Sequence, residues 1–371
     1  ANNNNKTIKD LDSMVGERAM CGVRRGAGAA LALVALLLLL LLARLPPPPA
    51  PRRPLPARLL PPEPAAPATT PPPPPPPTQP PASQAPPSSP VPKMQPPAKD
   101  TVAAKYVAGH ERAHPERCPR LGAKVRILIL ISSAPSHVTA RQAVRLTWGS
   151  AARRSDLAVA FVLGQPPANL RAAVDAEDEL YGDLIVGNFV DSYANLTLKT
   201  VSMLEWSDTY CPRADFLLKT DDDMFINVPL LVKFASSRLN ETRTIWGRVF
   251  AKERPARAKR AKYFVPVSEF PGRVFPPFAT GPAYLMTGDC VGALRRVAGG
   301  ARFLRLEDVF VTGVLASRLR LRRRPAAEFL NRRVLPDACL LRRRIALHQV
   351  RLHEQFELWR RLHDPNAKCK R

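Results

Sequence analysis

The sequence lacks several short motifs that identify large enzyme classes. It contains no glycine-rich phosphate loop, no GxSxG and no HExxH, which argues against P-loop nucleotidases, α/β serine hydrolases and zinc peptidases. None of its six cysteines stands in a CxxC pair. A structural zinc site is therefore not expected.

Acidic residues are scarce, with 31 Asp and Glu against 56 Lys and Arg, so the net charge is +25. A charge of this size ordinarily suggests nucleic acid. The excess is mainly arginine and concentrates near Arg318–Arg324 and Arg342–Arg344. Three explanations stay open: an anionic membrane, acidic glycans, or the arginine preference of a GC-rich genome.

One apolar run is long enough to cross a bilayer. It extends without interruption from Gly26 to Ala43 and would cover ~27 Å as a helix. We interpret residues 26–43 as a transmembrane signal anchor. A cleavable signal peptide is the alternative, but no small-x-small cleavage site follows. Residues 1–25 are then a cytoplasmic tail, the rest is lumenal, and nucleic acid is not an expected partner.

Residues 1–13 do not begin with Met, and Met14 or Met20 is the expected start. Half of residues 46–97 are proline, which excludes a helix or a sheet interior. Residues 44–104 are therefore expected to be an extended, O-glycosylated stem. Residues 105–371 have the composition of a globular lumenal domain. Its five cysteines allow two disulfides and one free thiol, in a pairing that the sequence does not define.

Three consecutive aspartates, Asp221 to Asp223, stand between the apolar runs Phe216–Leu218 and Met224–Ile226. Adjacent carboxylates repel one another and are tolerated at the edge of a core when a divalent cation sits there. The alternative is an acidic surface turn. The apolar flanks favour the cation, with a phosphate or diphosphate as its partner.

Strand-like and helix-like segments alternate before this triplet. The pattern predicts strands over 124–131, 157–163, 184–189 and 216–220, and helices over 137–147, 169–180 and 195–210. Such an alternation predicts an α/β fold with a parallel sheet covered by helices. Ligands bind beyond the carboxyl ends of such strands, which is where the aspartates fall. A further strand is predicted over 244–250 and a helix start near Glu307.

Seven segments carry a family resemblance, in chain order: Arg141–Trp148, Phe161–Gly164, Glu179–Asp183, Phe189–Thr200, Lys219–Asp223, Phe275–Tyr284 and Glu307–Gly313. Together they resemble the β-1,3-glycosyltransferase family, which includes β-1,3-galactosyltransferases and β-1,3-N-acetylglucosaminyltransferases. The resemblance implies a GT-A-like, Rossmann-type sheet in a Golgi type II membrane enzyme. Tyr263 and Phe275 replace the Trp and Tyr that are common in the family, which leaves the substrate open.

The resemblance implies that a sugar moves from a UDP-sugar to an acceptor glycan with inversion, assisted by Mn²⁺. Asp223 is the expected metal ligand, with His348 as a second ligand or an ordinary structural histidine. Asp221 and Asp222 are expected on the nucleotide side, with Asp221 near the ribose or uridine.

Inversion needs a base beside the acceptor hydroxyl, and Asp308 is the candidate because a helix N-terminus keeps a carboxylate ionised. Glu307 would position the acceptor or brace Asp308. Arg141 and Arg145 share a helix face and either reach the UDP or brace carboxylates beneath it.

Other residues have structural expectations. Trp148, Tyr193 and Leu198 are expected in the core. Asn195 and Asn240 begin N-glycosylation sequons, although Asn195 can instead cap its helix.

These observations predict a Golgi β-1,3-galactosyltransferase-like hexosyltransferase that acts on a glycoprotein or glycolipid. The oligomeric state is left open. An N-acetylglucosaminyltransferase is the alternative within the class. The alternatives outside it are an inactive lumenal glycan-binding homologue and a basic, membrane-tethered interaction protein.

Overall fold

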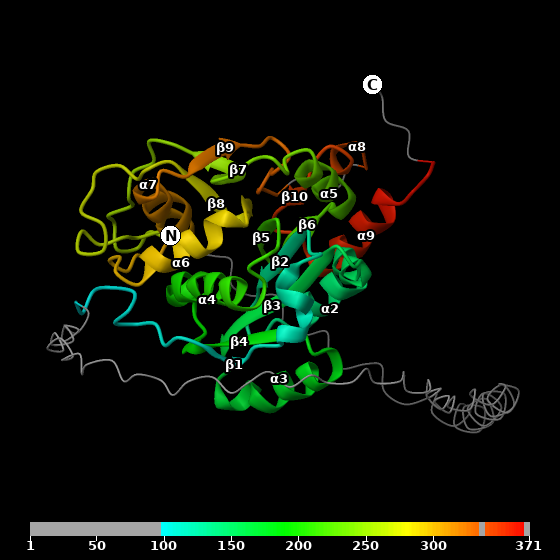
Figure 1. The fold of residues 1–371 in the computed structure, drawn as a ribbon, viewed down its shortest axis with the longest axis horizontal. Helices are drawn as coiled ribbons and strands as arrows, with labels where there is room; N and C mark the ends of the chain where they lie inside the picture. The colour runs from blue at the N-terminus through cyan, green and yellow to red at the C-terminus, as the bar shows by residue number, and fades with distance from the viewer. Residues whose placement is uncertain (1–97, 334–337, 367–371) are drawn as a thin grey trace, which may run out of the picture. The chain divides into compact units, whose positions relative to one another are not determined.

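The computed structural model describes residues 98–333 and 338–366. In this part of the chain an eight-stranded sheet runs in the order β1-β4-β3-β2-β5-β8-β7-β9 (Figure 1). Its strands are β1 His110–Arg112, β2 Ile127–Ser132, β3 Leu157–Gln165, β4 Leu184–Val190, β5 Phe216–Asp221, β7 Thr244–Phe250, β8 Phe278–Thr287 and β9 Arg322–Pro325. A separate ribbon pairs β6 (Phe225–Ile226) with β10 (Ala346–Leu347). The predicted α/β class is confirmed.

Helices connect the strands at nearly the predicted positions. The α-helices are α2 Val138–Leu146, α3 Ala168–Tyr181, α4 Leu196–Tyr210, α5 Val228–Ser236, α6 Asp289–Ala298, α7 Ala316–Arg318, α8 Ala338–Leu341 and α9 Leu352–Leu362. The 3-10 turns are η1 Pro115–Arg117, η2 Pro119–Gly122, η3 Trp148–Arg153 and η4 Tyr193–Asn195, and η5 Val309–Leu315 is a π-helix.

The four strands expected from the sequence form the parallel centre of the sheet, β4-β3-β2-β5. Strand β2 shows why it forms there, because apolar residues occupy both of its faces. Leu128 and Leu130 enter one core, whereas Ile127, Ile129 and Ile131 enter the other. Burying each such side chain contributes about 1.5–3 kcal/mol, so this strand is stable only with helices on both faces.

The sheet is mixed, because three further strands extend its parallel centre, and this extension was not expected from the sequence. Strand β8 pairs antiparallel with β5, β7 pairs antiparallel with β8, and β9 pairs parallel with β7. Most of the family segment Phe275–Tyr284 lies in β8. The sequence had left the role of the arginines that stand in β9 open. They lie on an edge strand, where charge blocks pairing with a further strand.

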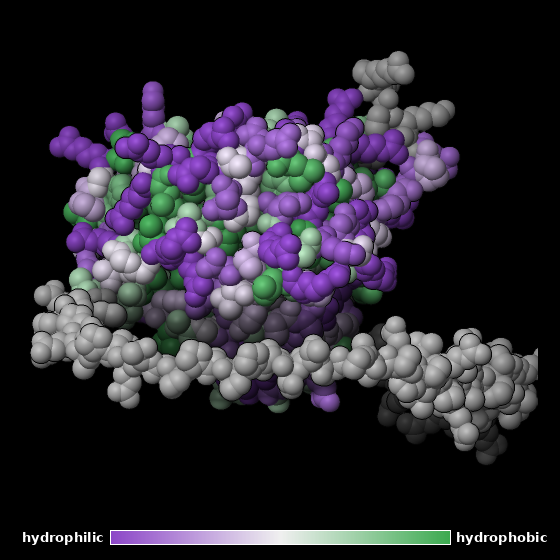
Figure 2. Space-filling model, viewed as in Figure 1, coloured by the Kyte–Doolittle hydropathy of each residue, from purple (hydrophilic) through white to green (hydrophobic). Residues whose placement is uncertain are grey.

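Helices cover both faces of the sheet. On one face α4 and α6 lie side by side (Figure 1) and contribute Leu198, Leu204 and Leu294 to the core. On the other face Val144 of α2 and Leu358 of α9 pack in the second core. The face seen in Figure 2 is largely hydrophilic, with apolar groups visible between the polar ones.

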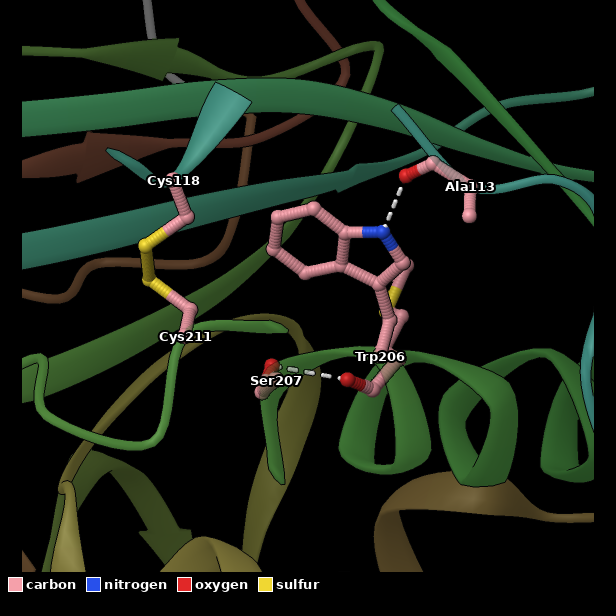
Figure 3. Close-up of a disulfide and its surroundings, with 6 residues drawn as sticks. Ala113, Cys118, Trp206, Ser207 and Cys211 are labelled. Atoms are coloured by element: carbon pink, nitrogen blue, oxygen red, sulfur yellow. Dashed lines mark hydrogen bonds between the residues drawn. A yellow bond between two sulfur atoms is a disulfide. The ribbon is translucent and has the colours of Figure 1, made fainter. Parts of the chain in front are cut away.

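A disulfide joins Cys118 to Cys211 at the end of α4 (Figure 3). Beside it, the indole of Trp206 donates a hydrogen bond to the carbonyl of Ala113. Cys339 is also disulfide-bonded. Among the cysteines of the described residues, only the buried Cys290 is a free thiol.

The packed domain begins before Lys105, where the sequence placed its start. Val102 is fully buried, and its N–H donates to the carbonyl of Ala301 at 2.9 Å. The predicted tail, the signal anchor over 26–43 and most of the stem lie outside the described residues. Within 98–333 and 338–366, no helix has the length and apolarity to cross a membrane.

Candidate active site

The aspartate triplet lies at the carboxyl edge of the parallel strands, as predicted. Asp221 is the last residue of β5 and pairs in register with Ser132 at the end of β2. The N–H of Asp222 donates to the carbonyl of Ser132 at 3.1 Å. The chain then turns directly into β6. The triplet is therefore held by the sheet on one side and by the β6–β10 ribbon on the other.

This ribbon brings a distant histidine to the triplet. Because β10 pairs antiparallel with β6, His348, directly after β10, comes close to Asp223. His348 Nε2 lies 3.4 Å from Asp223 Oδ2, and the N–H of Val350 donates to the carbonyl of Asp223 at 2.9 Å.

Asp221, Asp223 and His348 each offer one ligand atom, and the three atoms lie within 4.8 Å of one another. Two carboxylates and an imidazole suit Mn²⁺ and related divalent ions. The donor set fits the expected metal and includes Asp221, which had been expected only on the nucleotide side.

A second acidic pair faces this cluster from the start of η5. Asp308 caps the π-helix, with Oδ1 accepting from the N–H of Val309 at 2.8 Å and Oδ2 from the N–H of Gly281 at 2.9 Å. A Cβ on residue 281 would lie 2.9 Å from Glu307 Oε1. A glycine is therefore needed for the backbone of β8 to approach these carboxylates.

Lys219 lies between the two halves of the site, which are the cluster of Asp221, Asp223 and His348 and the acidic pair Glu307 and Asp308. Its ammonium donates to Asp221 Oδ1 at 2.7 Å, to Glu307 Oε1 at 3.0 Å and to the carbonyl of Gly281 at 2.8 Å. Burial lowers the pKa of Lys219, but the two carboxylates outweigh it and raise that pKa above its ordinary value. Lys219 is therefore a permanent cation between the triplet and the second acidic pair.

Burial also sets the charge state of the acidic groups. It raises the pKa of Glu307 to about 7, against the opposing effect of Lys219. Thr200 Oγ1 and the hydroxyl of Tyr284 donate to Glu307 Oε2 at 3.1 and 3.2 Å. Burial raises the pKa of Asp308 too, although the N–H groups on it act in the opposite direction. The helix start therefore moderates this rise instead of lowering the pKa overall. Asp308 is consequently a stronger base than an exposed aspartate.

Asp222 turns away from its neighbours. Its Oδ2 accepts from Ser133 Oγ at 2.7 Å and from His137 Nδ1 at 2.9 Å. The hydrogen bond to Asp222 raises the pKa of His137. These contacts fasten the loop after β2 to the triplet, and a direct contact of Asp222 with a nucleotide stays a prediction.

Arg141 is completely buried, and its guanidinium forms a bidentate pair with Glu177 at 2.8 and 2.6 Å. Arg145 makes a similar pair with Asp183 at 2.9 and 2.7 Å and lies over the ring of Tyr181. Both arginines therefore support the region behind the loop after β2. This arrangement favours the bracing role, and nucleotide contacts of Arg141 and Arg145 stay predictions.

Three residues of this region were not assigned from the sequence: Lys199, Lys219 and Gly281. Lys199 is buried, and its ammonium lies 2.9 Å from Asp191 Oδ2. Burial lowers the pKa of Lys199, whereas Asp191 opposes that change. A signal existed for Lys219, because a lysine inside a strand that is buried on both faces requires carboxylate partners.

Trp148 and Leu198 are core residues as predicted, but Tyr193 is not. Its side chain is 61% exposed, because η4 carries it out of the fold before α4 begins. Tyr263 is exposed as well. Of the two sequon residues, Asn240 is exposed, whereas Asn195 is half-buried and donates to the carbonyl of Val190 at 2.9 Å. Glycosylation of either stays a prediction.

The chain matches known proteins over this region. A family model described as galactosyltransferase matches residues 139–326. The chain is 34% identical over 242 residues to beta-1,3-galactosyltransferase 5 from Homo sapiens, covering 64% of this chain and 78% of that protein. It is also 34% identical over 242 residues to a UDP-GalNAc:beta-1,3-N-acetylgalactosaminyltransferase 1 from Rattus norvegicus, covering 63% of this chain and 73% of that protein.

One solved structure similar to this chain is a mannosyltransferase, PcManGT from Pyrobaculum calidifontis in complex with GDP-Man and Mn²⁺. The TM-score is 0.35 at 12% identity, covering 59% of this chain and 58% of that chain. At that score the likeness carries no weight for the site.

Proposed function

This chain belongs to the galactosyltransferase family, and we propose that it transfers galactose from UDP-galactose to an acceptor glycan in β-1,3 linkage, with inversion. One observation carries the proposal. At a single sheet edge, a cluster suited to a divalent cation faces a buried carboxylate pair across Lys219. These are the two halves that such a transfer requires, one for the departing diphosphate and one for the attacking hydroxyl.

Asp223, His348 and Asp221 would hold the metal, which we propose to be Mn²⁺. When bound, it would supply positive charge against the diphosphate of the donor. Asp222 accepts a hydrogen bond from Ser133. This contact would fix the loop after β2 in the position in which the nucleotide binds.

Asp308 acts as the base. One lone pair on each of its oxygens accepts a backbone N–H, which fixes the carboxylate and leaves other lone pairs for the acceptor hydroxyl. As the hydroxyl oxygen attacks the anomeric carbon, its proton passes to Asp308, and UDP leaves with the electron pair of the broken bond. Glu307 and Lys219 position Asp308 and the backbone of Gly281.

The anchor over 26–43, the stem and a Golgi lumenal location belong to the same proposal. They are supported by the apolar run and the proline content. The acceptor is proposed to be a glycan on a glycoprotein or glycolipid.

A donor screen tests the proposal. The full chain is incubated with Mn²⁺, a galactose-terminated or N-acetylglucosamine-terminated acceptor, and UDP-galactose, UDP-GalNAc or UDP-GlcNAc in turn. We expect a β-1,3-linked galactose by NMR, and no product with EDTA or with Asp223→Ala. The equal identity to an N-acetylgalactosaminyltransferase makes UDP-GalNAc the second candidate. Failure to turn over any UDP-sugar would identify an inactive homologue.

A further inference from the structure

A cavity of about 480 Å³ has no role in the proposed transfer. One wall is the N-terminal segment that carries Lys99 and Lys105, and another is η4 with Asn195. Its third wall is the segment 302–305, which runs into Glu307 and Asp308. Three residues of extended chain span at most about 10 Å. The Cα atoms of Arg305, which lines the cavity, and of Asp308 are therefore at most about 10 Å apart.

The charge of the cavity is positive on balance. Its charged lining consists of Lys99, Lys105, Arg302 and Arg305 against Asp100 and Glu269. The two acids are already paired with arginines. Arg302 Nε lies 2.6 Å from Asp100 Oδ2, and Arg305 Nε donates to Glu269 Oε1 at 3.0 Å. Within the described part of the chain, Lys99 and Lys105 form no ion pair. Two exposed ammonium groups are thus left to face a ligand.

The remaining lining is typical of a sugar site. Lys105 Nζ lies 5.5 Å from the centre of the Phe303 ring, so an apolar surface and a cation stand together. Asn195 and Ser268 add a carboxamide and a hydroxyl on the same cavity. An aromatic ring can hold the apolar face of a pyranose, while the polar groups bind its hydroxyls and the ammonium groups bind an acidic substituent.

We propose that this cavity binds an acidic sugar of the acceptor, one carrying a carboxylate or a sulfate, next to the unit whose hydroxyl is galactosylated. The inference rests on the proposed transfer, which takes Asp308 as the base for the acceptor hydroxyl, and the segment 302–305 that lines the cavity leads into Asp308. It assigns Lys99 and Lys105 as specificity-determining residues and Phe303 as the apolar floor.

Two matched acceptors test the proposal with the full chain. Both carry the same terminal sugar, whose hydroxyl reacts, and this sugar is joined directly to glucuronic acid in one acceptor and to glucose in the other. We expect kcat/KM to be about tenfold higher for the glucuronate form at low salt, and the preference to shrink as salt screens the charges. A third acceptor with a sulfated sugar distinguishes the two acidic groups.

Lys99→Gln/Lys105→Gln should reduce this preference to near one, mainly through a lower kcat/KM for the glucuronate form. Lys124→Gln is the matched control, because Lys124 is exposed at the opposite end of β2. Equal rates on both acceptors by the wild type, or a preference that survives the double substitution, would overturn the proposal while the transferase activity stands.

Oligosaccharide binding measured in the absence of a UDP-sugar separates the proposal about the cavity from the proposal about galactose transfer. If no acceptor is galactosylated, saturation-transfer NMR with the glucuronate and glucose oligosaccharides still decides the cavity's ligand. Selective binding of the glucuronate form that is lost in Lys99→Gln/Lys105→Gln supports the cavity and leaves only the transfer refuted. Binding of anionic lipid vesicles through these lysines, without any effect of the acidic sugar, refutes the cavity proposal.

Discussion

Lys219 Nζ lies 3.0 Å from Glu307 Oε1, and the same ammonium lies 2.7 Å from Asp221 Oδ1. A single buried cation therefore joins the end of β5 to the start of η5. Glu307 and Asp308 would otherwise face the triplet as unscreened negative charges. The relative position of the two halves of the site depends on this ion pair.

Replacing Lys219 by Met should destabilise the fold in a pH-dependent way. A carboxyl whose pKa is raised by folding favours the folded state at low pH and loses that effect as pH rises through the folded value. Burial raises the pKa of Glu307 to about 7 even with Lys219 present. We expect the free energy of unfolding to fall by about 3 kcal/mol at alkaline pH, and by less at mildly acidic pH.

Urea unfolding at several pH values measures this effect. The double substitution Lys219→Met/Glu307→Gln should recover much of the loss at alkaline pH, because the unpaired charge is removed. A deficit that is the same at every pH, or that the second substitution does not relieve, would contradict the assigned ion pair.

Removal of His348 should weaken metal binding. Its imidazole lies 3.4 Å from the carboxylate of Asp223, so His348→Ala leaves the cluster with two donors. We expect Mn²⁺ affinity, followed by electron paramagnetic resonance, to fall at least about tenfold, and Asp223→Asn to abolish binding. Asp215→Asn, at the opposite end of β5, serves as control. Unchanged affinity in His348→Ala would make the histidine purely structural.

Arg141 should behave as a brace. Substitution by Met leaves the buried Glu177 with only Arg145, whose Nη1 lies 2.7 Å from Glu177 Oε1, at a cost of about 3 kcal/mol. The exposed pair Arg154–Asp156 provides a control, and Arg154→Met should cost at most about 1 kcal/mol. Affinity for UDP per folded molecule should not change in Arg141→Met. Normal stability with weakened UDP binding would instead show a direct nucleotide contact.

The Cys118–Cys211 disulfide should be a large contributor to stability, since it closes a loop with a sequence separation of 93. Loops of that size correspond to about 4.6 kcal/mol in the chain-entropy account. The double variant Cys118→Ser/Cys211→Ser should lose that amount in urea unfolding. Cys290→Ala, which removes the free thiol, should lose only about 1 kcal/mol. A double variant within about 1 kcal/mol of the wild type would contradict the assignment.

The central strands could be predicted because their residues are apolar on both faces, and no other arrangement buries both sides of β2 or β5. The triplet was found for a related reason, since carboxylates beside apolar runs need a special environment, whereas Asp308 was indicated by the family resemblance. Strand β9 could not be predicted, because three arginines carry no strand pattern and pair only where β7 offers an edge.

Contacts between segments that are far apart in the sequence could not be predicted either. Tyr193 belongs to the family segment Phe189–Thr200, and only the path of η4 shows that it is exposed. The proximity of His348 to Asp223 depends on the short β6–β10 ribbon, which no local pattern defines. The bracing of Arg141 by Glu177 likewise depends on how α2 packs against α3.

In the proposed mechanism Asp221, Asp223 and His348 serve the diphosphate while Asp308 acts as the base, and Asp308→Asn tests this assignment most directly. In the presence of Mn²⁺, UDP binding by calorimetry and galactose transfer are measured on the same preparation. We expect UDP affinity to match the wild type and kcat to fall by about 10²–10⁴, the contribution of a general base. Full transfer by Asp308→Asn, or loss of UDP binding together with transfer, would contradict the role assigned to Asp308.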